Sequence, residues 1–281
     1  FSPDGQRLAY AGNDASVRIR DADGSAELWQ GKRHTGLVYN LHFSPDGRRL
    51  ASGSEDGSIC IWDAGSGELL HHIEGHSVYV QAVAFSPDGQ QLASGSRDCT
   101  LALWDPASGQ ELKRIEVVTN GINSIAFSDD GRQVLLSNVD GSVGVWDLQA
   151  GRQVLEMTGH RYPSWTAVFH PDGATIASGS ADKSIIFWDR ETGAERMRLE
   201  GHEKDVYSIC FSADGGVLFS GSADHSIRVW PLAVEPARWA TMAAAWRAAD
   251  ADDRRRHQDE QAPAAVTAKP KGLLGRVFGR R

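Results

Sequence analysis

The sequence predicts an all-β protein in which copies of one four-stranded unit stack against each other, and two observations support that prediction. First, the stretch FSPDG or a close variant recurs, each copy beginning 42 residues after the one before. The copies begin at Phe1, Phe43, Phe85, Phe127, Phe169 and Phe211. Second, each period holds four short stretches of alternating apolar and polar residues separated by turn signals. A fixed period of about 20 to 50 residues is typical of propellers, solenoids and arrays.

The elements of one period follow in order along residues 39–76. YNLHF alternates as a half-buried strand does, and SPDG places Pro at the first central position of a tight turn. RRLASGS is the second strand, EDGS a turn whose Asp-Gly pair tolerates positive φ, and SICIWD the third strand. After a further turn at AGSG, ELLHHIEGH alternates as the fourth strand. The predicted strands are therefore 39–43, 48–54, 58–63 and 68–76.

The stacking of these units predicts the architecture. One four-stranded sheet of this size cannot cover both of its apolar faces, so neighbouring copies must pack against one another. Radial packing of such sheets gives a β-propeller. The Gly-His pairs, the LASGS stretches followed two residues later by Asp, and the Trp-Asp pairs that end strands together resemble the WD-repeat family. The resemblance covers residues 1–231 and recurs in register.

Four side chains recur in register in four of the six copies. They are His34, Ser52, Asp56 and Trp62; His76, Ser94, Asp98 and Trp104; His160, Ser178, Asp182 and Trp188; and His202, Ser220, Asp224 and Trp230. A Ser, a His and an Asp invite comparison with a catalytic triad, but an active site is normally built once. In the WD-repeat family such a set resembles a structural tetrad, in which Asp accepts from His, His from Ser, and Ser from the indole N–H. We therefore expect no catalytic residue here.

Two copies depart from this tetrad pattern. In the fourth copy, Val118 and Leu136 stand at the His and Ser positions, while Asp140 and Trp146 remain. Asp140 is then expected to cap only its own Asp-Gly turn. In the first copy, Tyr10 stands at the Ser position and Arg20 at the Trp position.

The two ends of the repeat region also depart from the full unit. Phe1 corresponds to the last residue of an innermost strand, and no fourth strand follows Pro231. The resemblance therefore predicts six repeats in residues 1–231, the first lacking its innermost strand and the last its outermost, in an incomplete ring. We expect the chain to be the C-terminal piece of a longer protein whose closed ring has six or, preferably, seven blades.

Composition favours a soluble globular protein without cofactor or metal. The chain of 281 residues is 41% hydrophobic and has no apolar run long enough to cross a membrane. Cys60, Cys99 and Cys210 occupy different positions in their repeats and form no metal-ligand spacing. Their odd number favours a reducing compartment, the cytoplasm.

Charge is distributed unevenly along the chain. Residues 1–231 carry a net charge of −12 and residues 232–281 a net charge of +4, so nucleic acid is not expected to bind the propeller. Residues 232–260 are rich in Ala, and Trp239, Met242 and Trp246 fall at helical spacing, either packing on the last blade or recognising a partner. Residues 261–281 are expected to be a flexible basic tail, with weak contact to an acidic surface as the alternative.

The resemblance implies a non-catalytic scaffold that binds other proteins or peptides through the top face of the propeller. Carried over position by position, this face contains Tyr39, Glu55, Tyr79, Gln81, Arg97, Asn123, Trp165, Asp205 and Tyr207. Exposed Trp, Tyr and Arg side chains are enriched in binding hot spots. The alternative for Tyr39 and Tyr207 is packing between blades. Two other functions remain open: a sensor module fused to an upstream effector, and an enzyme that uses the central channel.

Overall fold

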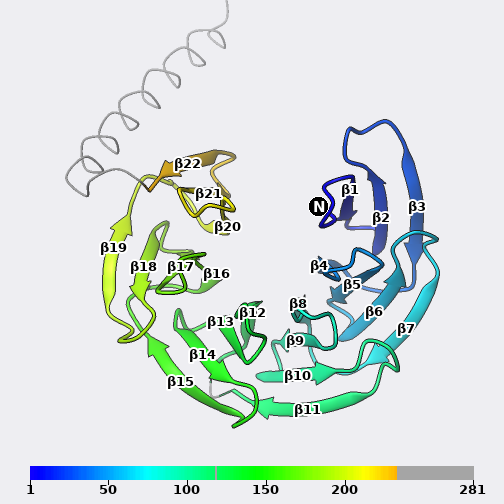
Figure 1. Cartoon of the computed structure of the whole chain (residues 1–281), viewed down its shortest axis with the longest axis horizontal. Helices are drawn as coiled ribbons and strands as arrows, with labels where there is room; N and C mark the ends of the chain where they lie inside the picture. Colours follow the sequence, from blue (N-terminus) through cyan, green and yellow to red (C-terminus); the bar gives the residue numbers. More distant parts are fainter. Residues whose placement is uncertain (118, 233–281) are drawn as a thin grey trace, which may run out of the picture. The chain divides into compact units, whose positions relative to one another are not determined.

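A computed structural model describes residues 1–117 and 119–232, which all belong to one unit of the chain. These residues form 22 strands in six antiparallel sheets, in each of which strands consecutive in sequence are neighbours (Figure 1). The expected all-β propeller of six repeats is thereby confirmed. Within the described part of the chain, the first and last sheets have three strands and the other four have four.

Each sheet consists of three or four short strands. The first sheet contains β1 (Arg7–Ala11), β2 (Ser16–Asp21) and β3 (Glu27–Lys32), and the second β4 (Val38–Phe43), β5 (Arg49–Ser54), β6 (Ser58–Asp63) and β7 (Leu69–Glu74). The third contains β8 (Val80–Phe85), β9 (Leu92–Ser96), β10 (Thr100–Trp104) and β11 (Glu111–Glu116), and the fourth β12 (Ile122–Phe127), β13 (Gln133–Asn138), β14 (Val143–Asp147) and β15 (Arg152–Met157). The fifth contains β16 (Ser164–Phe169), β17 (Thr175–Ser180), β18 (Ile185–Asp189) and β19 (Glu195–Leu199), and the sixth β20 (Val206–Phe211), β21 (Val217–Ser222) and β22 (Ile227–Pro231).

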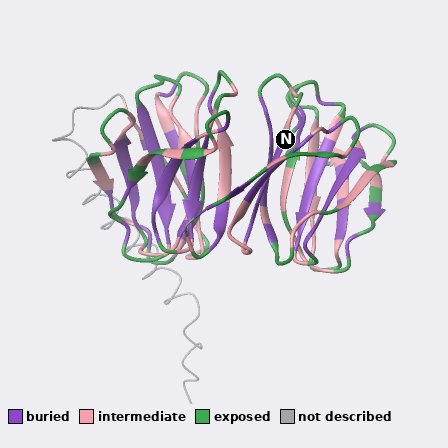
Figure 2. Ribbon diagram, turned by 90° about the horizontal axis from the view of Figure 1, so that it is seen from below, coloured by how far each residue is buried: buried purple, intermediate pink, exposed green. Residues whose placement is uncertain are grey.

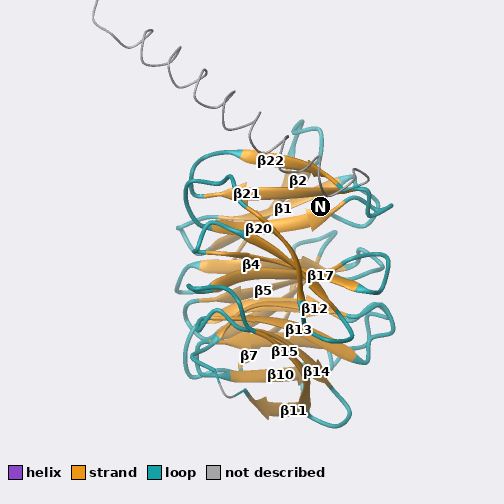
Figure 3. Ribbon diagram, turned by 90° about the vertical axis from the view of Figure 1, so that its left-hand side faces the viewer, coloured by secondary structure: helices purple, strands orange, loops and turns teal. Residues whose placement is uncertain are grey.

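The six sheets, called blades 1 to 6 below, follow one another in an arc. Strands β4, β8, β12, β16 and β20 lie on the inner side of the arc, and β7, β11, β15 and β19 lie on its outer side (Figure 1). The connecting loops gather at the two ends of the strands (Figure 3). Every inner strand therefore begins at the same end of the propeller, which brings equivalent residues of different blades close together.

The turn that follows each inner strand explains the repeated FSPDG stretch. In blade 2, the Ser44 hydroxyl donates to Asp46 Oδ1 (2.6 Å) and accepts from the Arg49 N–H (2.9 Å). Gly47 completes the turn with a φ of 68°. Glycine adopts this conformation with little strain because it has no Cβ. Each blade thus begins with a hairpin whose turn is fixed by its own side chains.

The hydrophobic core lies between neighbouring blades rather than inside one sheet. Ile59, Ile61, Val83 and Trp104 belong to one buried cluster that joins blades 2 and 3. The middle of the strands is mostly buried and the loops are mostly exposed (Figure 2). The Gly of the Gly-His pair serves this packing, because a Cβ at Gly75 would lie 2.5 Å from Cη2 of the Trp104 ring. Blades therefore stabilise one another pairwise.

The described residues include no helix with the length and apolar character that crossing a bilayer requires. The expected helical segment at 232–260 and the expected basic tail at 261–281 lie, apart from Leu232, outside the described residues.

Candidate binding face

A β-bulge at the start of each inner strand sets the geometry of the candidate face. In blade 2, Val38 pairs with Ser54 and Asn40 with Gly53, so Tyr39 has no partner in the ladder. The same shift of register recurs in the inner strands of blades 3 to 6. The residues left out of the ladder are Tyr39, Gln81, Asn123, Trp165 and Tyr207. A bulge leaves its extra residue unpaired and re-aims its side chain.

The five bulge residues line one cavity, which we call the bulge cavity. Its volume is about 430 Å³, and its walls come from blades 2 to 6. The lining residues are Tyr39, Asn40, Gln81, Arg97, Asn123, Ser124, Trp165, Thr166, Tyr207 and Ser208. Six of the nine residues expected on the binding face are therefore gathered around one space.

Two aromatic pairs include residues that line this cavity, and each pair crosses a boundary between blades. The rings of Tyr39 and Tyr79 are 6.1 Å apart, and those of Trp165 and Tyr207 are 5.5 Å apart with an edge-to-face geometry. Tyr39, Tyr79 and Tyr207 nevertheless keep 39%, 41% and 53% of their surface exposed. These rings thus contact a neighbouring blade and still offer a face to a partner.

The other expected residues, Glu55, Tyr79 and Asp205, lie beside lining residues without lining the cavity themselves. Asp205 accepts a hydrogen bond from the Trp165 indole N–H (3.1 Å). Glu55 accepts from the Leu37 N–H (3.3 Å), and burial together with the charge of Glu55 raises the pKa of Tyr39. Both carboxylates are therefore engaged by groups of the protein itself.

The Trp165 side chain has structural contacts that the sequence did not predict. No packing reason for an indole is visible in the sequence, but the ring contacts Tyr207 and donates to Asp205. Its partners come from the following blade, which only the three-dimensional arrangement reveals.

Asn40, Ser124, Thr166 and Ser208 were missed by sequence reasoning, although each directly follows a bulge residue. The signal was present, because three of these four equivalent positions carry a hydroxyl. Ser124 shows how such a residue is used, since its hydroxyl accepts from the Ala167 N–H of the next blade (3.1 Å). Asn40 does the same, because its Oδ1 accepts from the Val83 N–H of the next blade (3.2 Å).

In three blades, the four residues of the expected tetrad form one hydrogen-bonded chain. His160 Nδ1 lies 2.9 Å from Asp182 and Nε2 lies 2.8 Å from Ser178 Oγ, which also accepts from the Trp188 indole N–H (2.8 Å). Equivalent bonds of 2.7 to 3.0 Å link the sets that contain His76 and His202. The Ser178 side chain is fully buried between these two partners, where no substrate reaches it.

Blade 2 departs from this arrangement at its carboxylate. His34 Nε2 lies 2.7 Å from Ser52 Oγ, but Nδ1 lies 3.5 Å from Asp56 and only 2.9 Å from Ser58 Oγ. The equivalents of Ser58, which are Thr100, Ser184 and Ser226, also donate to the turn Asp of their own blades at 2.6 to 2.7 Å. This hydroxyl is a fifth recurrent member that sequence reasoning missed.

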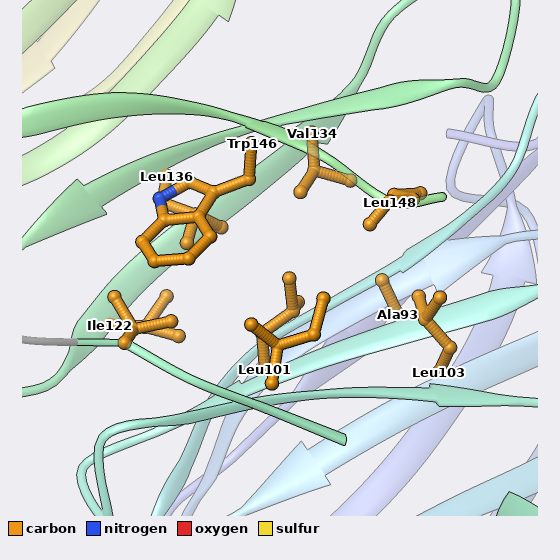
Figure 4. Close-up of a cluster of buried hydrophobic side chains, with 10 residues drawn as sticks. Ala93, Leu101, Leu103, Ile122, Val134, Leu136, Trp146 and Leu148 are labelled. Carbon is orange, nitrogen blue, oxygen red and sulfur yellow. The ribbon is translucent and has the colours of Figure 1, made fainter. Parts of the chain in front are cut away.

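Blade 4 replaces the polar chain by apolar packing. The Trp146 indole N–H has no hydrogen-bond partner among the described residues, and the ring packs in a buried cluster with Leu136, Ile122 and Leu101 (Figure 4). Asp140 accepts from the N–H and the hydroxyl of Ser142 (2.9 and 2.6 Å), as expected for a residue that caps its own turn. Val118, at the His position, lies outside the described residues.

Blade 1 also lacks the tetrad. The Tyr10 hydroxyl donates to Glu27 Oε2 (2.7 Å), and Arg20 donates to the carbonyl of Gly24. Both side chains serve contacts within their own sheet.

The described residues contain no group of three or more His, Cys, Asp or Glu side chains arranged to hold a metal ion. Cys60, Cys99 and Cys210 are all free thiols. Burial raises the pKa of Cys60 to about 12, so this thiol stays protonated and unreactive at neutral pH.

Comparisons with known proteins agree with the architecture. A family model described as "IFT122 first beta-propeller" matches residues 1–194. A second, described as "WD domain, G-beta repeat", matches residues 193–231. A search of curated proteins gave no match.

Proposed function

The chain belongs to the WD-repeat β-propeller family, and from this premise we propose that it is a scaffold that captures a peptide segment of a partner protein at the bulge cavity. WD-repeat propellers generally bind other proteins and are typically non-catalytic. Because fold alone does not determine function, the proposal depends on the site.

One observation supports this site above others, namely the convergence of five bulge residues from five blades on one cavity. Two aromatic pairs, Tyr39 with Tyr79 and Trp165 with Tyr207, contribute rings to this site. Tyr and Trp side chains bury a large area at modest entropic cost and keep a polar group for hydrogen bonding, which is why they dominate hot spots. We infer that a peptide segment inserts side chains into this cavity.

The proposal is tested by selecting peptides from a displayed random library on the 281-residue protein. We expect Tyr79→Ala and Tyr207→Ala each to weaken binding of the selected peptides by about 1 to 4 kcal/mol, with little change in thermal stability. Leu112→Ala is the matched control, because Leu112 is 53% exposed on the outer strand β11. If both tyrosine variants bind like the control, the binding face lies elsewhere.

Two further parts of the proposal rest on sequence alone. The odd number of cysteines supports a reducing compartment, the cytoplasm. The basic residues of 261–281 support a weak contact with an acidic surface.

A further inference from the structure

We propose that the bulge cavity selects a peptide that carries a carboxylate, an Asp or Glu side chain seated on Arg97. This inference rests on the proposed function and specifies the chemistry of the partner. It is carried by two buried polar atoms of the cavity wall that lack partners in the described parts of the chain, Arg97 Nε and Asn123 Oδ1.

Arg97 is the one ionised side chain among the residues that line the cavity. Its guanidinium group makes no ion pair or hydrogen bond with any residue in 1–117 or 119–232, and its Nε is buried. Arg97 as a whole is half-buried, so an anion can reach its guanidinium group, while the buried Nε has no partner that offsets its desolvation. Guanidinium binds carboxylate through two parallel hydrogen bonds.

The position of Arg97 is fixed before any ligand arrives. A Cβ on Gly121 would lie 2.9 Å from Cδ and 3.1 Å from Cα of Arg97, so the glycine of the next blade makes room for the stem. Gly121 also has a φ of 118°, a conformation that side chains rarely adopt. Such a preset side chain loses less entropy on binding than a free surface arginine.

Asn123 supplies the complementary acceptor. Its Nδ2 donates to the carbonyl of Ser164 in the next blade (2.8 Å), which fixes the orientation of the amide. The Oδ1 atom is therefore left as a buried acceptor without a partner among the described residues. A main-chain N–H of the peptide would satisfy it, while the acidic side chain reaches Arg97.

Recognition of the carboxylate depends on Arg97 and not on the net charge of the protein. Residues 1–231 carry a net charge of −12, so an acidic peptide gains nothing from the overall field of the protein. Asp205 and Glu55 accept hydrogen bonds from Trp165 and from the Leu37 N–H, and within the described residues neither forms an ion pair with Arg97. Affinity for the carboxylate should therefore depend on one residue.

The experiment uses the peptides selected on the 281-residue protein and asks whether they carry Asp or Glu. For a selected peptide, we expect a Glu→Gln or Asp→Asn change to weaken binding about 10- to 100-fold. Arg97→Gln should cause a similar loss, and the two changes combined should cost little more than either alone, because both remove one interaction. Arg97→Lys should weaken binding less than Arg97→Gln.

Controls separate this inference from the proposed function. Arg48→Gln, in the turn at the other end of β4, should leave binding unchanged. Thermal unfolding of Arg97→Gln should occur at or above the wild-type temperature, whereas a large decrease would assign Arg97 a structural role and overturn the inference. If amide-containing peptides bind equally well but Tyr207→Ala abolishes their binding, the carboxylate assignment is wrong and the proposed function stands.

Two further outcomes are decisive. Peptides that bind more than tenfold better when a phosphoserine replaces the Glu, and that require Arg97, would identify phosphate rather than carboxylate as the anion. If no selected peptide is affected by Tyr79→Ala or Tyr207→Ala, the proposed function itself fails.

Discussion

At the scale of single residues, the buried histidines of the tetrads make hydrogen bonds through both ring nitrogens. The side chains of His76 and His160 are fully buried, and each bridges a serine hydroxyl and a carboxylate. Each bond made by such a residue also satisfies a buried partner. We propose that the tetrads stabilise their own blades.

Replacing a tetrad histidine should destabilise the protein. His202→Ala removes the bonds to Asp224 and Ser220 (2.8 and 2.7 Å) and leaves buried groups without partners. We expect the free energy of unfolding to fall by about 2 to 3 kcal/mol, measured by urea denaturation. Val118→Ala is the comparison, because the valine in the equivalent position of blade 4 offers no hydrogen bond. Equal midpoints for the two variants would contradict the role of the tetrads.

Stability should decrease as the pH falls below neutrality. Burial, only partly offset by the turn Asp, lowers the pKa of His34 and His76 below the ordinary value of 6.5. The unfolded chain therefore takes up protons from about pH 6.5 downward while the folded chain does not, and stability is lost over that range. Urea midpoints at about pH 8 and about pH 5 should show this decrease. His76→Gln should lose stability at high pH but show a shallower dependence; an unchanged slope would argue against this assignment.

A second loss should follow at lower pH from the carboxylates. Burial alone would raise the pKa of Asp56, but the bonds from Ser58 and from the Thr35 N–H outweigh it and keep the pKa low. A carboxyl group whose pKa is lowered by folding contributes stability above its unfolded value, and that contribution is lost as the pH falls below about 4.

At the scale of elements, blade 4 shows that a blade does not require the tetrad. Leu136 is fully buried against Trp146 in the place where other blades have a serine. The indole N–H is left without a partner among the described residues, which costs about 1 to 3 kcal/mol. Burying a leucine contributes at least as much, so the exchange is tolerated.

Restoring the serine alone should therefore destabilise blade 4. Leu136→Ser gives Trp146 an acceptor, worth about 1 kcal/mol, but removes a packed side chain worth about 2 to 5 kcal/mol. We expect a net loss of about 2 to 3 kcal/mol in thermal or urea unfolding. Leu135→Ser is the matched control on the opposite face of β13, where the buried cluster offers no unpaired indole. It should cost about 1 kcal/mol more, and a smaller loss than that of Leu136→Ser would contradict this balance.

Strands and turns were predictable from the sequence because their signals are local. The alternation in residues 39–76 and the Asp-Gly turns correspond to β4 to β7 within a few residues. The resemblance also placed the five bulge residues together on the top face. The unsatisfied atoms of Arg97 and Asn123 and the bond between Trp165 and Asp205 depend instead on contacts between blades, which no local pattern contains.

At the scale of the whole described unit, stability should be unevenly distributed along the arc. Among the described sheets, blades 1 and 6 each have a neighbour on one side only (Figure 1). Blade 6 accordingly exposes apolar side chains, with Ile227 at 80% and Val229 at 45%. In a repeat architecture each blade is stabilised by its own contacts and by those with its neighbours. Blades 2 to 5, which have a neighbour on both sides, should therefore unfold locally least often.

Hydrogen exchange should detect this gradient. Amides of β21 in blade 6 should exchange faster than those of the equivalent strands β9 and β13, because β21 lacks a second packed neighbour within the described unit. Mass spectrometry of peptides from these strands measures the difference directly. Uniform protection across the blades would show that the unit unfolds as one cooperative body.

The bulges of the inner strands allow such a protein to acquire new binding specificity. A residue without a partner in the strand ladder can be replaced without shifting the register of its strand. Substitution of Tyr39 or Gln81 should therefore leave the pairing of the strands intact. At these two positions the side chain can therefore change without changing how the strands pair. Randomising Tyr39 and Gln81 together should yield folded proteins with altered ligands, which makes this face a starting point for engineered binders.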